Sequence, residues 1–171
     1  MGMKKLLAFL LSIILMMTIL CSCGNNISGK YKSMWNEKEY YSFQNGNYTT
    51  ADSDDNGTFV NDGNSVVLTN KKHKSTFTIQ ENYLLSIPYK GVIPDTNFFN
   101  VVCTDEDSTV TMQFNIDGTF NRTVNLFDNN VSTFKGIYTR NKEIITIIFD
   151  SGDKCKLLVK DNLLYEAYIK E

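Results

Sequence analysis

Short runs of alternating apolar and polar residues, separated by Asn-Gly and Asp-Gly pairs, constrain this chain most. In residues 74–80 (KSTFTIQ), Phe77 and Ile79 fall on one face, and residues 154–160 (KCKLLVK) alternate in the same way. A period of two is typical of a strand with one face in the core. Asn-Gly and Asp-Gly pairs accept positive φ and close tight antiparallel hairpins. The sequence therefore predicts an all-β protein built as an antiparallel meander.

The chain also resembles itself at an offset of 71 to 80 residues, which predicts internal repeats over residues 29–90 and 97–171. The matching pairs include Phe43 and Phe114, Gly57 and Gly136, and Asn82 and Asn162. Self-similarity of this kind is typical of supersecondary units that bury their faces against each other. Any β-meander repeats its turn and strand signals, so two architectures stay open. They are a single barrel and two packed repeat half-barrels.

The N-terminus carries two lysines, Lys4 and Lys5, and then an apolar run from residue 6 to residue 20. This pattern is typical of the charged and hydrophobic regions of a signal peptide, which we expect to be helical over residues 1–22. The run is shorter than the roughly 20 apolar residues that a membrane-spanning helix needs. A permanent transmembrane helix is therefore the weaker interpretation.

The residues that end this run, Leu20, Cys21, Ser22 and Cys23, resemble the lipobox of bacterial lipoproteins. The resemblance implies that Cys23 carries diacylglycerol and becomes the first residue of the mature chain, with residues 23–28 as a lipidated tether. Two or more acyl chains hold a protein stably on a membrane. The alternatives are an ordinary secretory signal and a redox or metal pair, but C-x-C has neither the spacing of a thioredoxin site nor partners for zinc.

Residues 27–85 are similar to the lipocalin-like domains of small bacterial lipoproteins, and residues 109–167 are so more loosely. The similarity rests on SGKY with Gly29 and Tyr31, on the aromatic strand YYSFQNG, and on GTF, NSVVLT and FTIQENYLL. It implies that residues 29–171 form a lipocalin-like β domain with a closed or partly closed antiparallel barrel. Such closure removes exposed strand edges.

Charge and the titratable residues exclude several function classes. Removal of residues 1–22 takes away Lys4 and Lys5, which leaves 15 basic and 19 acidic residues and a net charge of −4. Nucleic acid is therefore not an expected partner, because phosphate binding needs a basic face. The single histidine, His73, lies in a lysine-rich turn (NKKHKS), so a catalytic or metal-binding role is not expected for it.

Two cysteines follow the lipobox, Cys103 and Cys155, and both lie in strand-like segments. Outside the cell they could form a disulfide that closes a loop of about 50 residues and stabilises the fold by roughly 3 to 4 kcal/mol. The alternative is a pair of buried apolar thiols.

The loop DSDDNG matches the first half of a calcium-binding loop, with Asp52, Asp54 and Asn56 as candidate ligands. The second half does not match, because Gly63 stands where a bidentate glutamate belongs. A solvated acidic hairpin loop is the alternative. Calcium is the only cofactor that the sequence brings into consideration.

Aromatic residues gather in YKSMWNEKEYYSF, where Tyr31, Trp35, Tyr41 and Phe43 are candidate ligand-binding residues. Aromatic side chains can line an apolar pocket. The alternative is that they fill the core, since a barrel of about eight strands has an interior that side chains can fill.

These observations predict a lipoprotein of the bacterial cell envelope, held by its lipid on the extracytoplasmic face of the cell membrane. Its β domain is expected to bind a small apolar ligand or an envelope protein without catalysis. The alternative is a structural protein, or an inhibitor or immunity-type interaction protein with a filled barrel. An enzyme built from carboxylates ranks third, because spacing in the sequence selects no pair among the 19 acids.

Overall fold

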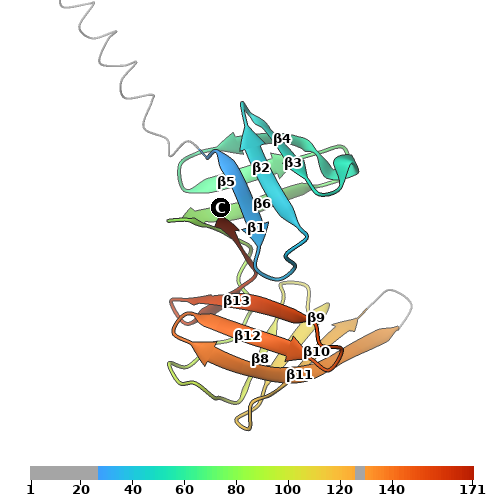
Figure 1. Ribbon diagram of the computed structural model, residues 1–171, viewed down its shortest axis with the longest axis vertical. Coiled ribbons are helices and arrows are strands. Elements are labelled where there is room, and N and C mark those ends of the chain that lie inside the picture. The colour runs from blue at the N-terminus through green and yellow to red at the C-terminus, as the bar shows by residue number, and fades with distance from the viewer. Residues whose placement is uncertain (1–26, 126–129) are drawn as a thin grey trace, which may run out of the picture.

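The computed structural model describes residues 27–125 and 130–171, and this part of the chain is all-β apart from one 3-10 turn, η1 (Ser53–Asp55). Two antiparallel barrels lie one above the other along the long axis of the molecule (Figure 1). The predicted all-β antiparallel meander is confirmed. The signal-peptide helix and Cys23 lie outside the described residues.

The first barrel is closed and has eight strands, in the order β1-β15-β7-β6-β5-β4-β3-β2. Seven of its strands follow one another in the sequence as a meander, and the eighth comes from the C-terminus. The strands are β1 (Gly29–Ser33), β2 (Tyr40–Gln44), β3 (Asn47–Thr50), β4 (Gly57–Asn61), β5 (Ser65–Thr69), β6 (Lys74–Gln80), β7 (Tyr83–Leu85) and β15 (Ala167–Lys170).

The second barrel has seven strands in simple sequence order and is nearly closed. Isolated bridges join Tyr89 to Leu164 in the last strand and Lys90 to Thr104 in the first strand. Residues 89–90 therefore span the gap between the two edge strands. The strands are β8 (Val101–Thr104), β9 (Val110–Phe114), β10 (Thr119–Asn125), β11 (Val131–Asn141), β12 (Ile144–Phe149), β13 (Lys154–Lys160) and β14 (Leu163–Tyr165).

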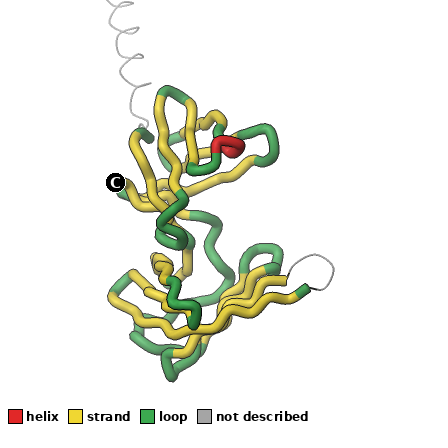
Figure 2. The backbone as a smooth tube through the Cα atoms, turned by 45° about the vertical axis from the view of Figure 1, so that its right-hand side comes forward, coloured by secondary structure: helices red, strands yellow, loops and turns green. Residues whose placement is uncertain are grey.

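The two barrels exchange their closing segments. The segment after β7 of the first barrel closes the second barrel through Tyr89, and β15, which follows β14 of the second barrel, enters the first barrel between β1 and β7. In Figure 1 the dark red C-terminal strand accordingly lies among the blue and green strands. Figure 2 shows the two strand stacks and the loops that pass between them. Strands β1 to β7 of the first barrel thus lie within residues 29–90 and strands β8 to β14 of the second barrel within residues 97–171, whereas residues 89–90 and 167–170 each join the other barrel.

Each barrel is filled by its own cluster of apolar side chains. The first encloses Tyr31, Phe43, Tyr48, Val66, Leu68, Phe77 and Leu84. The second encloses Phe99, Cys103, Met112, Phe114, Phe120, Tyr138, Ile145, Ile147, Cys155 and Leu157, among others. A third cluster of Leu85, Leu158 and Ala167 joins the barrels. Because each barrel buries its apolar side chains inside, both gain their main stabilisation from hydrophobic burial.

The predicted turns are confirmed in part. Asn45 and Gly46 have φ of 50° and 77° and close the hairpin between β2 and β3, as an Asn-Gly pair in a two-residue turn does. Gly57 instead begins β4, where a Cβ atom would overlap the carbonyl oxygen of Thr69. Close approach of the backbones, and not turn geometry, requires this glycine. None of the described segments forms a helix long and apolar enough to span a membrane.

Candidate functional site

The loop of residues 34–39, between β1 and β2, leaves the first barrel and contacts the second. Met34 donates its backbone N–H to the carbonyl oxygen of Ala167 (2.8 Å), and Lys156 of β13 donates its backbone N–H to the carbonyl oxygen of Met34 (2.8 Å). The hydroxyl oxygen of the buried Ser33 accepts the backbone N–H groups of Trp35 (3.2 Å) and Asn36 (3.0 Å). These bonds hold Trp35 against the core of the second barrel.

A groove of about 830 Å³ lies between this loop and residues of β10, β11, β12 and β13 of the second barrel. Its aromatic walls meet edge to face: the ring centroids of Trp35 and Phe149 are 6.0 Å apart, and those of Phe134 and Phe149 are 6.4 Å apart. Ligand sites typically occupy about 300–1,000 Å³. The lining residues are Trp35, Asn36, Glu37, Lys38, Glu39, Arg122, Phe134, Phe149, Ser151, Asp153, Lys154 and Cys155.

Arg122 of β10 forms part of the groove from the interior face of the second barrel. It is paired across the sheet with Met112 and Phe134, and directly paired residues share a face. Its guanidinium carbon lies 4.9 Å from the centre of the Trp35 ring, which is a cation–π contact. The Nε atom of Arg122 is buried and has no hydrogen-bond partner.

The four aromatic residues predicted to bind ligand do not form one site. Tyr31 and Phe43 are buried in the core of the first barrel, where their rings meet edge to face at 5.6 Å. Trp35 lies in the groove at the second barrel, and Tyr41 lines a different pocket. Core filling, the alternative weighed for these residues, is what the structure shows for two of them.

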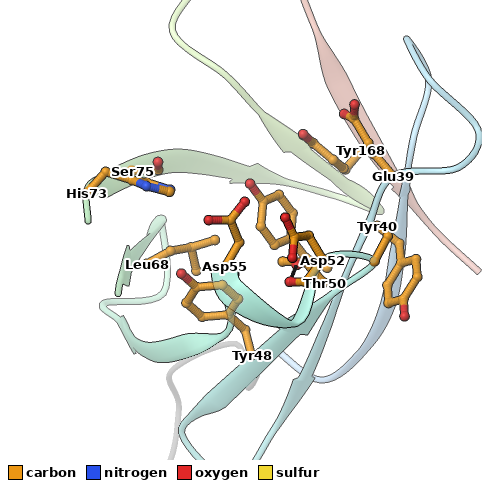
Figure 3. Close-up of a pocket in the computed structure, with 12 residues that line it drawn as sticks. Glu39, Tyr40, Tyr48, Thr50, Asp52, Asp55, Leu68, His73, Ser75 and Tyr168 are labelled. Carbon is orange, nitrogen blue, oxygen red and sulfur yellow. Dashed lines mark hydrogen bonds between the residues drawn. The ribbon is translucent and has the colours of Figure 1, made fainter. Parts of the chain in front are cut away.

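The pocket that contains Tyr41 lies at the mouth of the first barrel and has a volume of about 240 Å³. Figure 3 shows Tyr48, Asp52 and Asp55 together at this pocket, with His73 and Ser75 at its opposite side. Burial raises the pKa of Tyr41 and of Tyr168, whose rings are 4.9 Å apart. This pocket is smaller than the usual range of ligand sites.

Two of the predicted calcium ligands, Asp52 and Asn56, accept hydrogen bonds from backbone N–H groups of their own loop. Asp52 Oδ1 accepts the backbone N–H of Asp54 (3.0 Å), and Asn56 Oδ1 accepts the backbone N–H of Thr50 (2.8 Å). These bonds cap η1 and close the loop before β4. Across residues 27–125 and 130–171, no three or more His, Cys, Asp or Glu side chains are placed to hold a metal ion.

Cys103 and Cys155 are free thiols in the core of the second barrel, and not a disulfide. This is the alternative of two buried apolar thiols. Burial raises the pKa of Cys103 to about 11 and that of Cys155 to about 12. Both thiols are therefore protonated at neutral pH, which makes them poor nucleophiles.

Arg122, Phe134 and Phe149 are not among the site residues predicted from the sequence. A signal for Arg122 was present, because Phe120, Arg122 and Val124 share one face of a strand whose first member is apolar and buried. A charged residue on the inward face of a strand is unusual unless it has a partner or a ligand. Phe134 and Phe149 carried no such signal, since aromatic residues are common in strands.

The groove is suited to reversible binding. It offers aromatic faces, one guanidinium group and a protonated thiol, and these groups can hold a ligand without forming or breaking covalent bonds. Its loop side belongs to the first barrel and its floor to the second, so both barrels are needed to build it.

No protein-family model matches the chain, and no curated protein or solved structure matches it significantly.

Proposed function

We propose that this protein is a lipoprotein of the bacterial cell envelope with a lipocalin-like fold, anchored through lipid on Cys23. On the extracytoplasmic face of the membrane, its two barrels form a binding module that takes a small, mainly apolar ligand without catalysis. The groove of about 830 Å³ beneath Trp35 is the observation that carries this proposal.

The filling of both barrels supports the groove as the ligand site. Side chains such as Phe43 and Phe114 fill the two interiors. A ligand is therefore expected outside the barrel axes. The groove has the aromatic walls and the volume of a ligand site, whereas the pocket beside Tyr41 has about 240 Å³.

Native mass spectrometry of the chain purified from its own host tests this proposal. We expect a co-purifying small molecule on the wild-type protein that is lost from Trp35→Ala. The matched control is Tyr40→Ala, which removes an aromatic residue from the smaller pocket and should keep the ligand. A ligand-free wild-type protein, or a ligand lost only from Tyr40→Ala, would show that the groove is not the binding site.

Labelling with radioactive palmitate tests the anchor. Incorporation should disappear in Cys23→Ala and persist in Cys21→Ala, because the proposed cleavage removes Cys21 with the signal. Equal labelling of wild type and Cys23→Ala would contradict lipidation at this residue.

A second candidate function, protein binding of the inhibitor or immunity type, is favoured by the apolar surface of the second barrel. Of the ten large apolar side chains that are exposed in the described residues, seven lie between residues 92 and 137: Val92, Phe98, Val102, Ile116, Val131, Phe134 and Ile137. Exposed apolar patches commonly mark interaction sites. This candidate predicts that Val102→Lys abolishes copurification of a stoichiometric envelope protein without loss of the small molecule.

A further inference from the structure

We infer that the groove selects an anionic ligand, namely a small organic carboxylate with an apolar body, and that Arg122 binds its carboxylate. This inference rests on the proposed ligand-binding function and names the class of ligand. It starts from a comparison of the two arginines in the chain, Arg122 and Arg140.

The guanidinium N–H groups of Arg140 have hydrogen-bond acceptors within the protein. Its guanidinium donates to the carbonyl oxygens of Lys142 (2.7 Å), Thr96 (3.2 Å) and Pro94, and it forms an ion pair with Asp95 at 3.4 Å. Arg140 therefore fastens the segment around residue 95 to β11. Its donors have structural partners, so it is not available to a ligand.

Arg122 lacks partners of this kind. None of the ion pairs within the described ranges includes it, and its buried Nε has no acceptor. Burying a donor of a charged group without an acceptor is costly, so such a group is a candidate for binding an external acceptor. Trp35 covers one side of the guanidinium, and this contact uses its π face and no N–H group.

Within the described ranges, no acidic residue near the groove forms an ion pair with Arg122. Glu37, Glu39 and Asp153 are exposed at the rim; Glu39 accepts from Asn36 Nδ2 (2.9 Å), and Asp153 accepts from Ser151 Oγ (2.8 Å). Glu166 accepts the hydroxyl hydrogen bond of Tyr89 at 2.6 Å, and its charge acts on Tyr89 and Cys155, as the charge of Arg122 also does. The buried Nε of Arg122 nevertheless has no carboxylate partner.

Among ligand groups, a carboxylate matches the hydrogen-bonding geometry of the Arg122 guanidinium best. Guanidinium and carboxylate groups are planar and form paired, charge-assisted hydrogen bonds. With its carboxylate on Arg122, a ligand would place its apolar body against Trp35, Phe134 and Phe149. Charge complementarity to Arg122 and the apolar walls together define this ligand class.

The test uses Trp35, the only tryptophan in the chain, as a fluorescent reporter. The full chain in phosphatidylcholine nanodiscs is titrated with 4-phenylbutyrate, 4-phenylbutan-1-ol and 4-phenylbutylamine, which share one apolar body. We expect the carboxylate to bind about ten-fold more tightly than the alcohol, with the amine weakest, as a charge-assisted hydrogen bond implies. Empty nanodiscs provide the blank for partitioning into lipid.

Variants then assign the preference to Arg122. Arg122→Gln should lower the affinity for 4-phenylbutyrate about ten-fold and leave the affinity for the alcohol within about two-fold. Lys71→Gln removes the same charge from an exposed turn of the first barrel and should change the affinity for neither ligand. Arg122→Lys keeps the charge without the planar fork and should give an intermediate affinity.

The outcomes separate this inference from the proposed function. Equal affinities for the three ligands in the wild-type protein, or no effect of Arg122→Gln, would overturn the carboxylate inference while ligand binding stands. Absence of any fluorescence response to all three ligands would overturn both. If Arg122→Gln does not fold, the order of the three ligands on the wild-type protein decides alone.

Discussion

The backbone N–H of Tyr89 donates to the carbonyl oxygen of Leu164 at 2.9 Å, and this bond ties the segment after β7 into the second barrel. The equivalent pair in the first barrel is Tyr168 and Leu84, which face each other across β15 and β7. Each barrel is thus closed by a segment that continues from the other. Unfolding one barrel should therefore disturb the closure of the other.

Replacement of Tyr168 tests this coupling. Its ring contacts those of Tyr41 (4.9 Å) and Phe77 (5.6 Å), so Tyr168→Ala should lower the free energy of unfolding by about 2–4 kcal/mol. Because Cys103 and Cys155 lie in the core of the second barrel, their reaction with Ellman's reagent in urea should shift to lower urea together with the circular dichroism midpoint. Ile169→Ala, on the exposed face of the same strand, is the control. An unchanged midpoint for the reaction of these two thiols would show that the barrels unfold independently.

The hydrogen bonds of the Tyr138 hydroxyl should contribute to the stability of the second barrel. Its buried hydroxyl accepts the backbone N–H of Phe99 (2.9 Å) and donates to the carbonyl oxygen of Asn115 (3.0 Å). Tyr138→Phe leaves the backbone N–H of Phe99 without this acceptor and removes one of the two hydrogen bonds to the carbonyl oxygen of Asn115, which also accepts the N–H of Gly118. The variant should lower the free energy of unfolding by about 1–3 kcal/mol in a urea titration. Tyr40→Phe, at the less buried mouth of the first barrel, should change it little; equal effects of the two variants would contradict the assigned role.

Gly136 marks a close approach of two strands in the second barrel. A Cβ atom there would overlap the carbonyl oxygen of Ile148, as a Cβ atom at Gly57 would overlap that of Thr69 in the first barrel. Gly136→Ala should therefore lower the free energy of unfolding by about 3 kcal/mol. Thr133→Ala, at an exposed position of the same strand, is the control for calorimetry. A melting temperature equal to that of the control would refute the steric argument.

The thiols Cys103 and Cys155 predict both reactivity and pH dependence. In the folded protein Ellman's reagent should detect neither, and in denaturant both should react; two unreactive cysteines in denaturant would indicate a disulfide.

Burial raises the pKa values of the Cys103 and Cys155 thiols, so the folded state keeps protons that the unfolded state releases. Their contribution to stability is complete below the ordinary pKa of 9.0 and falls as pH rises toward 11 and 12. Cys103→Ala/Cys155→Ala should remove this part of the pH dependence.

Local pattern predicted much of the fold. The alternation in KSTFTIQ placed Phe77 inward, and that in KCKLLVK did so for Cys155, Leu157 and Val159, which are buried. The exchange of β15 could not be read in the same way. A strand signal such as AYIK fixes which face is apolar but not which edge it joins, because several free edges accept the same backbone pairing.

The site was predictable only at Trp35. Its groove depends on a loop of the first barrel that reaches β10 and β12 of the second, and this contact spans more than 80 residues of sequence. Sequence proximity instead grouped Trp35 with Tyr31 and Phe43, which alternate inward on neighbouring strands of the first barrel. Tertiary contacts between the barrels decided the grouping of these aromatic residues.

The most direct test of the binding site is the indole N–H resonance of Trp35 in a ¹H–¹⁵N correlation spectrum of the full chain in nanodiscs. With one tryptophan in the chain, this resonance needs no assignment. Added small molecules extracted from the envelope of the host should shift it and the backbone resonances of Phe134 and Phe149. Shifts confined to Tyr41 and Asp55, or no shift at all, would contradict a ligand site in the groove between the barrels.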